Sequence, residues 1–374
     1  MKVSCSQENL THGVNMVQRA VSDKNTMPIL GGIFLQAKEN SLSFRATNLE
    51  LSIECTVTAE IEEEGCVVLP ARIFSELVRR LPQGPIYIES ENEGTSVKIR
   101  YNQSELQLNT FNAEEFPSLP EVKEENKVIL NASLLKNMIK QVAIAISKDE
   151  SRPIFTGVLF EFEQSLLNMV ATDTHRLALR QGQINEHYSG LEQTSFIIPG
   201  RTLMELSRLL NEEAGEVQLI FTESQAMFSF ENIRVVSRLI EGTFPNYRQV
   251  IPEERNTRIT IENSTFLQAV ERASLFARDE DHQGFSVIKL KTTDSGLIID
   301  GASPELGRVH EEVVASVEGE MTEIAFNAKY ISDVLKVIEA EEIIMDLSGS
   351  LSPGVIKPRE SDGYLYLILP VRMD

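Results

Sequence analysis

Apolar residues recur along this chain at two spacings, one typical of helices and one typical of strands. Residues 6–22, 131–147 and 261–277 place apolar side chains three and four positions apart and hold a Ser or Asn near each start. This spacing predicts three helices with capped beginnings. Apolar and polar residues alternate instead in segments 32–37, 42–46, 157–162, 167–171, 287–291 and 297–300, which predicts strands.

A second kind of helix is predicted in three segments that share one sequence pattern, at residues 70–79, 199–208 and 327–336. Each follows a short strand-like segment, at 66–69, 196–198 and 323–326. The copies lie about 128 residues apart, which is the size of a whole domain and exceeds the roughly 20 to 50 residues of a solenoid unit. We therefore expect an α+β fold of three repeated domains, each with two helices packed on antiparallel sheet, at residues 1–126, 127–256 and 257–374.

The second helix of each copy carries two basic residues seven positions apart with an acid between them: Arg72 and Arg79, Arg201 and Arg208, and Lys329 and Lys336. At 3.6 residues per turn the two lie on one helix face. In a single helix, solubility and pairing with the acid explain this arrangement. Its recurrence in three copies favours a basic surface that holds a phosphate backbone without reading bases. No aromatic–basic pattern of the single-strand stacking type occurs, so a duplex is the more natural partner.

The overall charge fits a nucleic-acid partner only if the charges are segregated. Acidic residues outnumber basic ones by 56 to 35, and the net charge of −21 normally argues against such a partner. The three cysteines, Cys5, Cys55 and Cys66, have no metal-ligand spacing and favour free thiols in a reducing compartment. The chain has no apolar run typical of a signal peptide or a spanning helix, so we expect a cytoplasmic protein.

Motifs for phosphate loops, dinucleotide binding, zinc hydrolysis and serine nucleophiles do not occur in the sequence. The one cluster whose residue types could take part in catalysis lies at residues 171–177. There Asp173 and His175 would share a strand face and could act as an acid–base pair. A hydrogen-bonded turn that positions a loop is the favoured interpretation, because no nucleophile or metal ligand accompanies the pair. We expect no enzyme activity, no metal and no cofactor.

Four motifs in one order resemble the bacterial sliding clamp family, the beta subunit of DNA polymerase III. They are Asn-Thr-Met-Pro-Ile-Leu-Gly at 25–31, Ala-Thr-Asp-Thr-His-Arg-Leu-Ala at 171–178, Glu-Gly-Thr-Phe-Pro-Asn-Tyr-Arg at 241–248 and Leu-Ile-Leu-Pro-Val-Arg at 367–372. The resemblance covers the full length. It implies a DNA-clamp fold in a head-to-tail homodimeric ring around duplex DNA, with helices lining the hole and acid outside. Such a processivity factor slides on DNA and is opened by a clamp loader.

The resemblance also implies roles for single residues. The best candidates for DNA contact are Lys24, Arg152, Arg201 and Arg208, and the repeat supports four further channel positions, Arg72, Arg79, Lys329 and Lys336. Ring closure would bring Leu275 and Phe276 of one protomer against Leu106 and Leu108 of the other.

A second implied site is an apolar cleft that takes short linear motifs from the replicative polymerase, the clamp loader and repair proteins. Its lining would be Phe155, Thr172, Thr174, His175, Arg176, Leu177, Pro245, Tyr247, Val250, Leu367, Leu369, Pro370, Val371, Arg372 and Met373. Aliphatic and Met side chains make an adaptable pocket, while His175 and Arg176 would fix polar groups of a peptide. Residues 367–371 are equally explained as a buried final strand, and both interpretations can hold together.

The chain departs from the family at two positions of this cleft. Thr174 stands where a small Gly or Ser is usual, and Asp374 extends the tail by one acid. Either change would narrow the mouth or make it more selective. Two other function classes stay open: a repeat scaffold that binds only proteins, and a hydrolase that uses Asp173 and His175.

Overall fold

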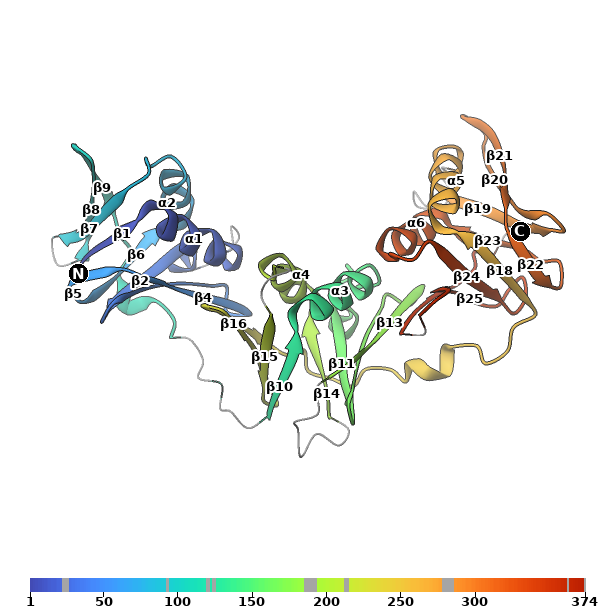
Figure 1. Cartoon of the computed structure of the whole chain (residues 1–374), viewed down its shortest axis with the longest axis horizontal. Coiled ribbons are helices and arrows are strands. Elements are labelled where there is room, and N and C mark those ends of the chain that lie inside the picture. The colour runs from blue at the N-terminus through green and yellow to red at the C-terminus, as the bar shows by residue number, and fades with distance from the viewer. Residues whose placement is uncertain are drawn as a thin grey trace. The chain divides into compact units, whose positions relative to one another are not determined.

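The computed structural model describes residues 1–21, 27–91, 94–118, 122, 126–184, 194–211, 215–277, 286–361 and 363–372. Contacts between Cα atoms divide the chain into two compact units. Unit 1 comprises Met1–Ser133 and Arg208–Leu239, and unit 2 comprises Leu134–Ser207 and Ile240–Asp374 (Figure 1).

Unit 1 contains two antiparallel sheets. The five-stranded sheet runs in the order β5 (Glu60–Glu63), β1 (Lys2–Ser6), β7 (Pro85–Glu91), β8 (Ser96–Tyr101) and β9 (Ser104–Asn109). The eight-stranded sheet runs in the order β10 (Asn126–Asn131), β15 (Glu216–Phe221), β16 (Gln225–Phe230), β17 (Ile233–Arg238), β4 (Leu51–Thr58), β3 (Ser41–Thr47), β2 (Gly32–Lys38) and β6 (Gly65–Pro70). Side chains alternate between buried and half-buried along β16, as expected for a strand with one face on the core.

Two α-helices pack together on these sheets. Helix α1 (Gln7–Val17) begins at Ser6, whose Oγ accepts a hydrogen bond from the Asn9 backbone N at 3.1 Å. It packs on β3 and β4 beside α2 (Ala71–Val78) (Figure 1). A Cβ at Gly13 would lie 2.4 Å from the Phe44 ring, so the helix approaches β3 closely because this position has no side chain. The 3-10 helices of unit 1 are η1 (Gln18–Ala20), η2 (Pro28–Gly31) and η4 (Ala113–Glu115).

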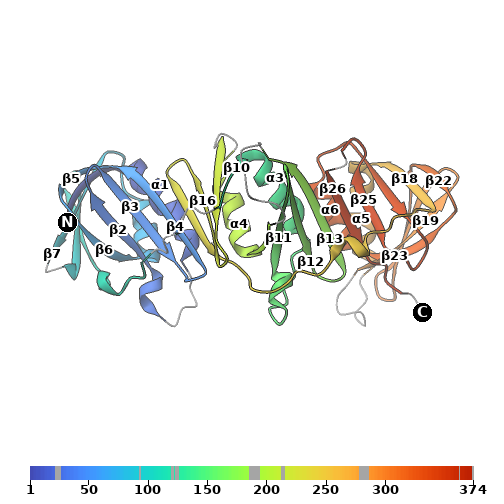
Figure 2. The same cartoon turned by 90° about the horizontal axis from the view of Figure 1, so that it is seen from below.

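Unit 2 also contains two antiparallel sheets. The nine-stranded sheet runs in the order β14 (Thr194–Pro199), β11 (Gly157–Glu163), β12 (Leu166–Thr172), β13 (Arg176–Gln183), β26 (Tyr364–Ile368), β25 (Gly354–Pro358), β24 (Glu342–Leu347), β18 (Thr257–Glu262) and β22 (Ser316–Gly319). The four-stranded sheet runs in the order β21 (Gly307–Val314), β20 (Gly296–Ser303), β19 (Val287–Thr293) and β23 (Glu323–Asn327). Figure 2 shows β13 and β26 side by side, although they lie far apart in the sequence.

The remaining helices belong to the second and third copies of the repeat. They are α3 (Ala132–Ala143), η5 (Pro153–Thr156), α4 (Gly200–Leu209), η6 (Tyr247–Val250), α5 (Asn263–Phe276) and α6 (Ala328–Val337). Helices α5 and α6 pack on each other, and α5 lies on β20 and β21. Phe266 of α5 and Phe326 of β23 are fully buried.

The predicted helices and strands are confirmed, although two helices are shorter than expected. The helix predicted over residues 6–22 leaves α geometry at Val17 and continues as η1, and the one predicted over 131–147 ends at Ala143. In both places the chain tightens into hydrogen bonds to the third residue back, from Val21 N to Gln18 O and from Ile146 N to Ala143 O. Residue 22 lies outside the described residues.

Candidate functional site

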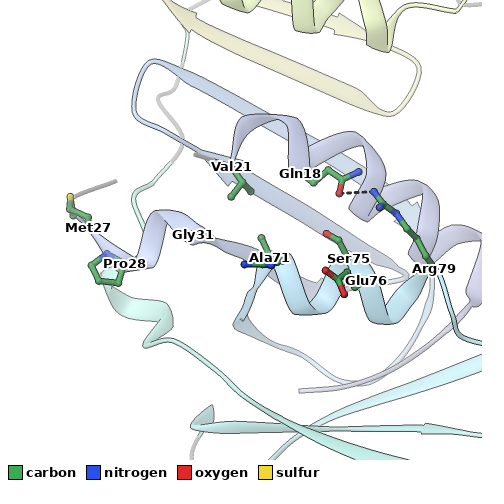
Figure 3. Close-up of a pocket in the computed structure, with 10 residues that line it drawn as sticks. Gln18, Val21, Met27, Pro28, Gly31, Ala71, Ser75, Glu76 and Arg79 are labelled. Atoms are coloured by element: carbon green, nitrogen blue, oxygen red, sulfur yellow. Dashed lines mark hydrogen bonds between the residues drawn. The ribbon is translucent and has the colours of Figure 1, made fainter. Parts of the chain in front are cut away.

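The basic residues predicted on α2 and α4 are exposed. Arg72 and Arg79 line a cavity of about 530 Å³ between α2 and the segment that follows α1. Figure 3 shows Arg79 reaching Gln18, and its Nη2 donates to Gln18 Oε1 at 3.0 Å. Arg201 and Arg208 lie exposed at the equivalent positions of α4. The structure therefore confirms a solvent-facing basic pair on each of these helices.

The basic residues of α6 are exposed as well, but each already binds a carboxylate. Lys329 Nζ lies 2.7 Å from Asp333 Oδ2, one helical turn away. Lys336 Nζ lies 2.8 Å from Glu271 Oε1 of α5. Helix α6 of the third copy thus presents less uncompensated positive charge than its sequence suggests.

Two further DNA-contact candidates lie in the segments after the opening helices. Arg152 is exposed, with its Nε 3.5 Å from Asp149 Oδ2 and its guanidinium 5.5 Å from the centre of the Phe155 ring. Lys24 lies outside the described residues.

Hydrogen bonds to Thr172 and Asp173 build the turn between β12 and β13. Asp173 Oδ1 accepts from the backbone N of His175 and of Arg176, each at 3.0 Å. Thr172 Oγ1 donates to Arg176 O at 2.7 Å and accepts from Thr174 N at 3.1 Å. These bonds hold Thr174 at a φ of 78°, a left-handed conformation that is costly for a β-branched residue. The interpretation of this segment as a hydrogen-bonded turn is confirmed.

Arg176 lies in a network of ion pairs and aromatic contacts. Its side chain is only 9% exposed, with Nε donating to Asp173 Oδ2 at 3.0 Å and Nη1 donating to Asp333 Oδ2 at 2.8 Å. The guanidinium also lies 4.2 Å from the centre of the Tyr330 ring and within 3.4 Å of the Tyr366 hydroxyl. Burial opposes its charge, but Tyr366, Asp333 and Asp173 outweigh burial and raise the pKa of Arg176. Arg176 therefore anchors the turn to α6 through its Nε and Nη1.

An apolar cluster lies beside this turn. Its buried members are Leu159, Val170, Leu177, Ile197, Tyr247 and Leu367. Half-buried side chains pack against it from Ile154, Leu179, Ile240, Phe244, Ile251 and Leu365. Three of the predicted cleft residues, Leu177, Tyr247 and Leu367, thus meet in one cluster, although they come from distant parts of the sequence.

Other predicted cleft residues lie around this cluster with more exposure. Phe155 is half-buried and meets Phe244 edge-on, with ring centroids 6.5 Å apart. Val250 is 52% exposed and Leu369 is 39% exposed. Leu369 N donates to His175 O at 2.9 Å, which fixes the last segment to the turn. Pro245, His175 and Arg372 are exposed, whereas Thr172, Pro370 and Val371 are half-buried. Met373 and Asp374 lie outside the described residues.

The sequence did not indicate the polar support of this cluster. The Tyr247 hydroxyl donates to Glu161 Oε2 at 2.7 Å, and Arg248 Nη2 lies 2.7 Å from the same oxygen. Burial and then the bond to Glu161 raise the pKa of Tyr247. Glu161 interrupts the apolar run of strand β11, and this is the signal that the sequence offers. The contribution of Asp333 to the turn had no signal beyond its place between two lysines.

Over 384 aligned residues the chain is 38% identical to the beta sliding clamp of Bacillus subtilis (strain 168), with 100% of each chain covered. The chain belongs to the beta sliding clamp family. Its residues 1–120, 129–246 and 248–372 match the family models of the N-terminal, central and C-terminal domains of the DNA polymerase III beta subunit. It is also 36% identical to the beta sliding clamp of Staphylococcus epidermidis (strain ATCC 12228) over 381 residues, covering 100% of this chain and 99% of the relative.

Solved sliding clamps share the fold over the whole chain. The DNA polymerase sliding clamp from Bacillus subtilis matches with a TM-score of 0.95 at 37% identity, and 100% of each chain is covered. The DNA polymerase III beta subunit from Thermotoga maritima matches with a TM-score of 0.91 at 30% identity and the same coverage. A sliding clamp from Pseudomonas aeruginosa bound to griselimycin matches with a TM-score of 0.93 at 26% identity, again over 100% of both chains.

The residues predicted at the dimer interface of this clamp-family chain lie on or next to edge strands of two sheets. Leu106 and Leu108 are half-buried on β9, at the end of the five-stranded sheet. Leu275 is 58% exposed on α5, and Phe276 beside it is half-buried. Helix α5 packs on β21, which ends the four-stranded sheet. Both groups therefore accompany a strand that has one unpaired edge among the residues that the structure describes.

The part of this clamp-family chain that the structure describes offers neither a metal-binding cluster nor a membrane-spanning helix. Among its residues, His, Cys, Asp and Glu do not gather in a group of three or more suited to a metal ion. None of its helices is both long enough and apolar enough to cross a membrane.

Burial raises the pKa of Cys5 and of Cys55 to about 12, whereas Cys66 is exposed.

Proposed function

We propose that this chain is a DNA sliding clamp, two copies of which close head to tail into a ring that encircles duplex DNA. The observation that carries the proposal is the recurrence of exposed basic pairs on α2, α4 and α6 in a family member with a net charge of −21. Each pair belongs to one of three domains, at residues 1–126, 127–256 and 257–374. The chain acts as a processivity subunit without catalysis of its own.

Holding DNA by enclosure explains why weak contacts suffice. A closed ring cannot leave the duplex sideways, so each phosphate contact needs only to keep the DNA centred. Phosphate contacts carry no sequence information, and the ring can therefore slide over any sequence. In such a ring we expect the surplus acidic residues to lie on the outer surface, where they repel DNA from every face except the basic one.

The proposed DNA contacts form two classes. Arg72, Arg79, Arg201 and Arg208 come from helices α2 and α4, and Lys24 and Arg152 come from the segments after the opening helices. Arg152, Lys329 and Lys336 each lie beside a carboxylate that must be exchanged for a phosphate on binding. Exposed ion pairs are weak, so this exchange is cheap.

Ring closure is proposed to use Leu106 and Leu108 of one protomer against Leu275 and Phe276 of the other. The exposure of Leu275 and the unpaired edges of β9 and β21 support this pairing. The two faces are unlike, so the contact is heterologous and closes only if the rotation suits, here after two protomers.

The apolar cluster beside the turn at 172–177 is proposed to receive linear motifs of partner proteins. Its buried side chains provide a floor, and the exposed Val250, Leu369 and His175 provide a rim that a peptide can reach. Arg176 holds the turn that carries His175 in place through its bond to Asp333. The partners would be the replicative polymerase catalytic subunit, the clamp loader and other replication and repair proteins.

The experiment that tests the ring is retention on circular against linearised nicked plasmid. The clamp is loaded by a cognate loader with ATP and then held in salt high enough to screen phosphate contacts. Retention on the circle with loss from the linear form supports topological binding. Equal loss from both forms, after loading has been verified, contradicts it. The double variant Arg201→Ala with Arg208→Ala should load poorly, whereas Arg234→Ala, an exposed arginine on strand β17, should load normally.

A further inference from the structure

The carboxylate of Asp333, on helix α6, has two cationic partners. Its Oδ2 accepts a hydrogen bond from Arg176 Nη1 at 2.8 Å and another from Lys329 Nζ at 2.7 Å. Its Oδ1 accepts from Lys329 Nζ at 2.8 Å. A carboxylate oxygen has two lone pairs, so Oδ2 can bind both donors at once. A single carboxylate therefore joins two residues that the proposed function places in different sites.

The two partners of Asp333 differ in how firmly they are held. The Arg176 side chain is 9% exposed, its Nε donates to Asp173 and its guanidinium lies 4.2 Å from the centre of the Tyr330 ring. The Lys329 side chain is 65% exposed and lies one helical turn from Asp333. Exposed ion pairs of this kind are weak. Lys329 can therefore leave Asp333 while Arg176 stays.

Arg176 connects Asp333 to the rim of the proposed partner cleft. Its backbone N donates to Asp173 Oδ1, and so does the backbone N of His175, each at 3.0 Å. The His175 carbonyl in turn accepts from Leu369 N at 2.9 Å. The bond between Arg176 and Asp333 therefore helps to fix both rim residues relative to α6.

We propose that Asp333 couples the DNA channel to the partner cleft: a phosphate that binds Lys329 leaves Asp333 to Arg176 and strengthens partner binding. The inference rests on the proposed DNA and partner sites, and it adds an energetic link between them. Asp333 acts through Arg176 and Lys329 and contacts neither the DNA nor the partner. It is therefore a positioning residue.

The direction of the coupling follows from the charges. While Lys329 is bound, its ammonium competes for the Oδ2 atom that Arg176 uses, and the two cations repel each other across that atom. A phosphate removes both effects, because it draws the ammonium away and compensates its charge. The bond that remains between Arg176 and Asp333 is mostly buried, so water weakens it little. Arg176 also compensates the charge of Asp333, which would otherwise repel the phosphate.

The coupling is reciprocal, because each ligand must change the affinity for the other by the same factor. The carboxylate has two arrangements, one shared and one with Arg176 alone, and both ligands favour the second. A partner that immobilises the rim holds Arg176 against Asp333, which weakens the hold of Asp333 on Lys329. The competing bond to Lys329 is an exposed ion pair, so the factor is about 2- to 5-fold.

Helix α6 supplies a matched control for this link. Lys336 is the second lysine of the repeat on this helix, but it binds Glu271 of α5, with 2.8 Å between Nζ and Oε1. Its side chain is 54% exposed, close to the 65% of Lys329. Lys336→Gln thus removes one channel charge from α6 without breaking a bond to Asp333. Lys329→Gln removes the charge that competes with Arg176.

Peptide binding to the free clamp and to the clamp on DNA tests the coupling. The probe is a fluorescent synthetic peptide that copies the clamp-binding segment of the cognate polymerase catalytic subunit and is too short to hold DNA itself. Its dissociation constant is measured by anisotropy with the free clamp and with clamp loaded on nicked circular plasmid, at low salt that leaves phosphate contacts unscreened. The wild type should bind the peptide about 2- to 5-fold more tightly when loaded. Equal constants overturn the coupling.

The variants identify Asp333 as the link. Lys329→Gln should bind the peptide equally in both states, as tightly as the loaded wild type. Asp333→Asn keeps an acceptor for Arg176 but loses the shared charge, so it should also bind equally in both states, more weakly than the free wild type. Lys336→Gln should keep the ratio of the wild type. Loss of this ratio in Lys336→Gln, or its survival in Lys329→Gln, overturns the role of Asp333.

Failure of the coupling and failure of the proposed function give different results. Loss of the clamp from the circular plasmid contradicts the ring, and a peptide that does not bind the free clamp contradicts the cleft. A clamp that stays on the circle and binds the peptide with one affinity in both states contradicts the coupling alone. High salt should abolish the gain in the loaded wild type while the ring stays on the circle, because only the phosphate contacts are screened. A gain that survives high salt overturns the assignment to Lys329.

Discussion

The turn at residues 47–52 and the turn at residues 172–177 share their backbone and differ in their anchoring. In each, a threonine hydroxyl donates to the carbonyl four residues on, Thr47 to Leu51 at 3.2 Å and Thr172 to Arg176 at 2.7 Å. In each, the third residue has a positive φ, 75° at Leu49 and 78° at Thr174. The hydrogen-bonded frame of the turn is therefore common to the first two copies.

The difference lies at one position of this frame. The first turn carries Leu51, a buried apolar residue opposite Ser237 of β17. The second carries Arg176, whose guanidinium joins the turn to Asp333 and Tyr330 of α6. A repeated backbone can thus be held by apolar packing in one copy and by a buried ion network in another. We infer that the second turn is the more rigid, as suits a rim that presents His175 and Leu369 to a partner.

Replacing Arg176 by Ala is expected to have the largest effect. The change leaves the carboxylates of Asp173 and Asp333 without their buried cation, which costs about 3–5 kcal/mol of the free energy of unfolding. Calorimetry or urea unfolding would measure the loss. Arg234→Ala is the matched control: it removes a 66% exposed arginine from the equivalent junction and should cost less than about 1 kcal/mol. Similar losses in the two variants would contradict the distinction between the turns.

Removing the Tyr366 hydroxyl is expected to have a smaller effect of the same kind. This hydroxyl donates to Tyr330 O at 3.0 Å and accepts from Arg176, whereas the equivalent residue opposite the first turn is Val235. Tyr366→Phe should therefore cost about 1–2 kcal/mol. Unfolding measured at pH 8 would show it, and a loss below about 0.5 kcal/mol would mean that Arg176 needs no hydroxyl.

The same variant makes a prediction about alkaline pH. Burial raises the pKa of Tyr366 above its ordinary 10.0, so the native state keeps the phenol protonated where the unfolded chain would ionise. Its stabilisation is present below pH 10 and is lost as pH rises through the raised value. Tyr366→Phe should therefore flatten the fall in stability above pH 10. An unchanged fall would assign the alkaline loss to other groups.

Local pattern predicted the parts of this fold but not how the parts join. The spacing of apolar residues located α1, α3 and α5, and the sequence pattern shared by the three copies located α2, α4 and α6. Alternation located β3 and β12 as strands but gave no prediction for β4 and β17, which pair across a copy junction. Cross-junction pairing depends on which sheet edges remain open, and that becomes visible only in three dimensions.

The candidate site shows the same division. Leu177 and Leu367 were assigned to one apolar surface through resemblance to the family, and they do meet in one cluster. Arg176 was assigned to the same surface through that resemblance, and its burial depends on Asp333, which is distant in sequence. Burial of a charge is decided by a partner from elsewhere in the chain, so a local motif cannot predict it.

The smallest predicted effect concerns the residues that hold positive φ in the two turns. Thr174→Gly relieves the strain of a β-branched residue in a left-handed conformation, about 1–3 kcal/mol, against a cost of about 0.5–1 kcal/mol for the added freedom of the unfolded chain. A net gain of about 1 kcal/mol is expected in urea unfolding. Leu49→Gly is the control, because leucine is not β-branched and its relief should be close to the entropic cost. Equal gains at the two positions would show that branching at Thr174 adds no strain, and the shared frame would then account for both turns.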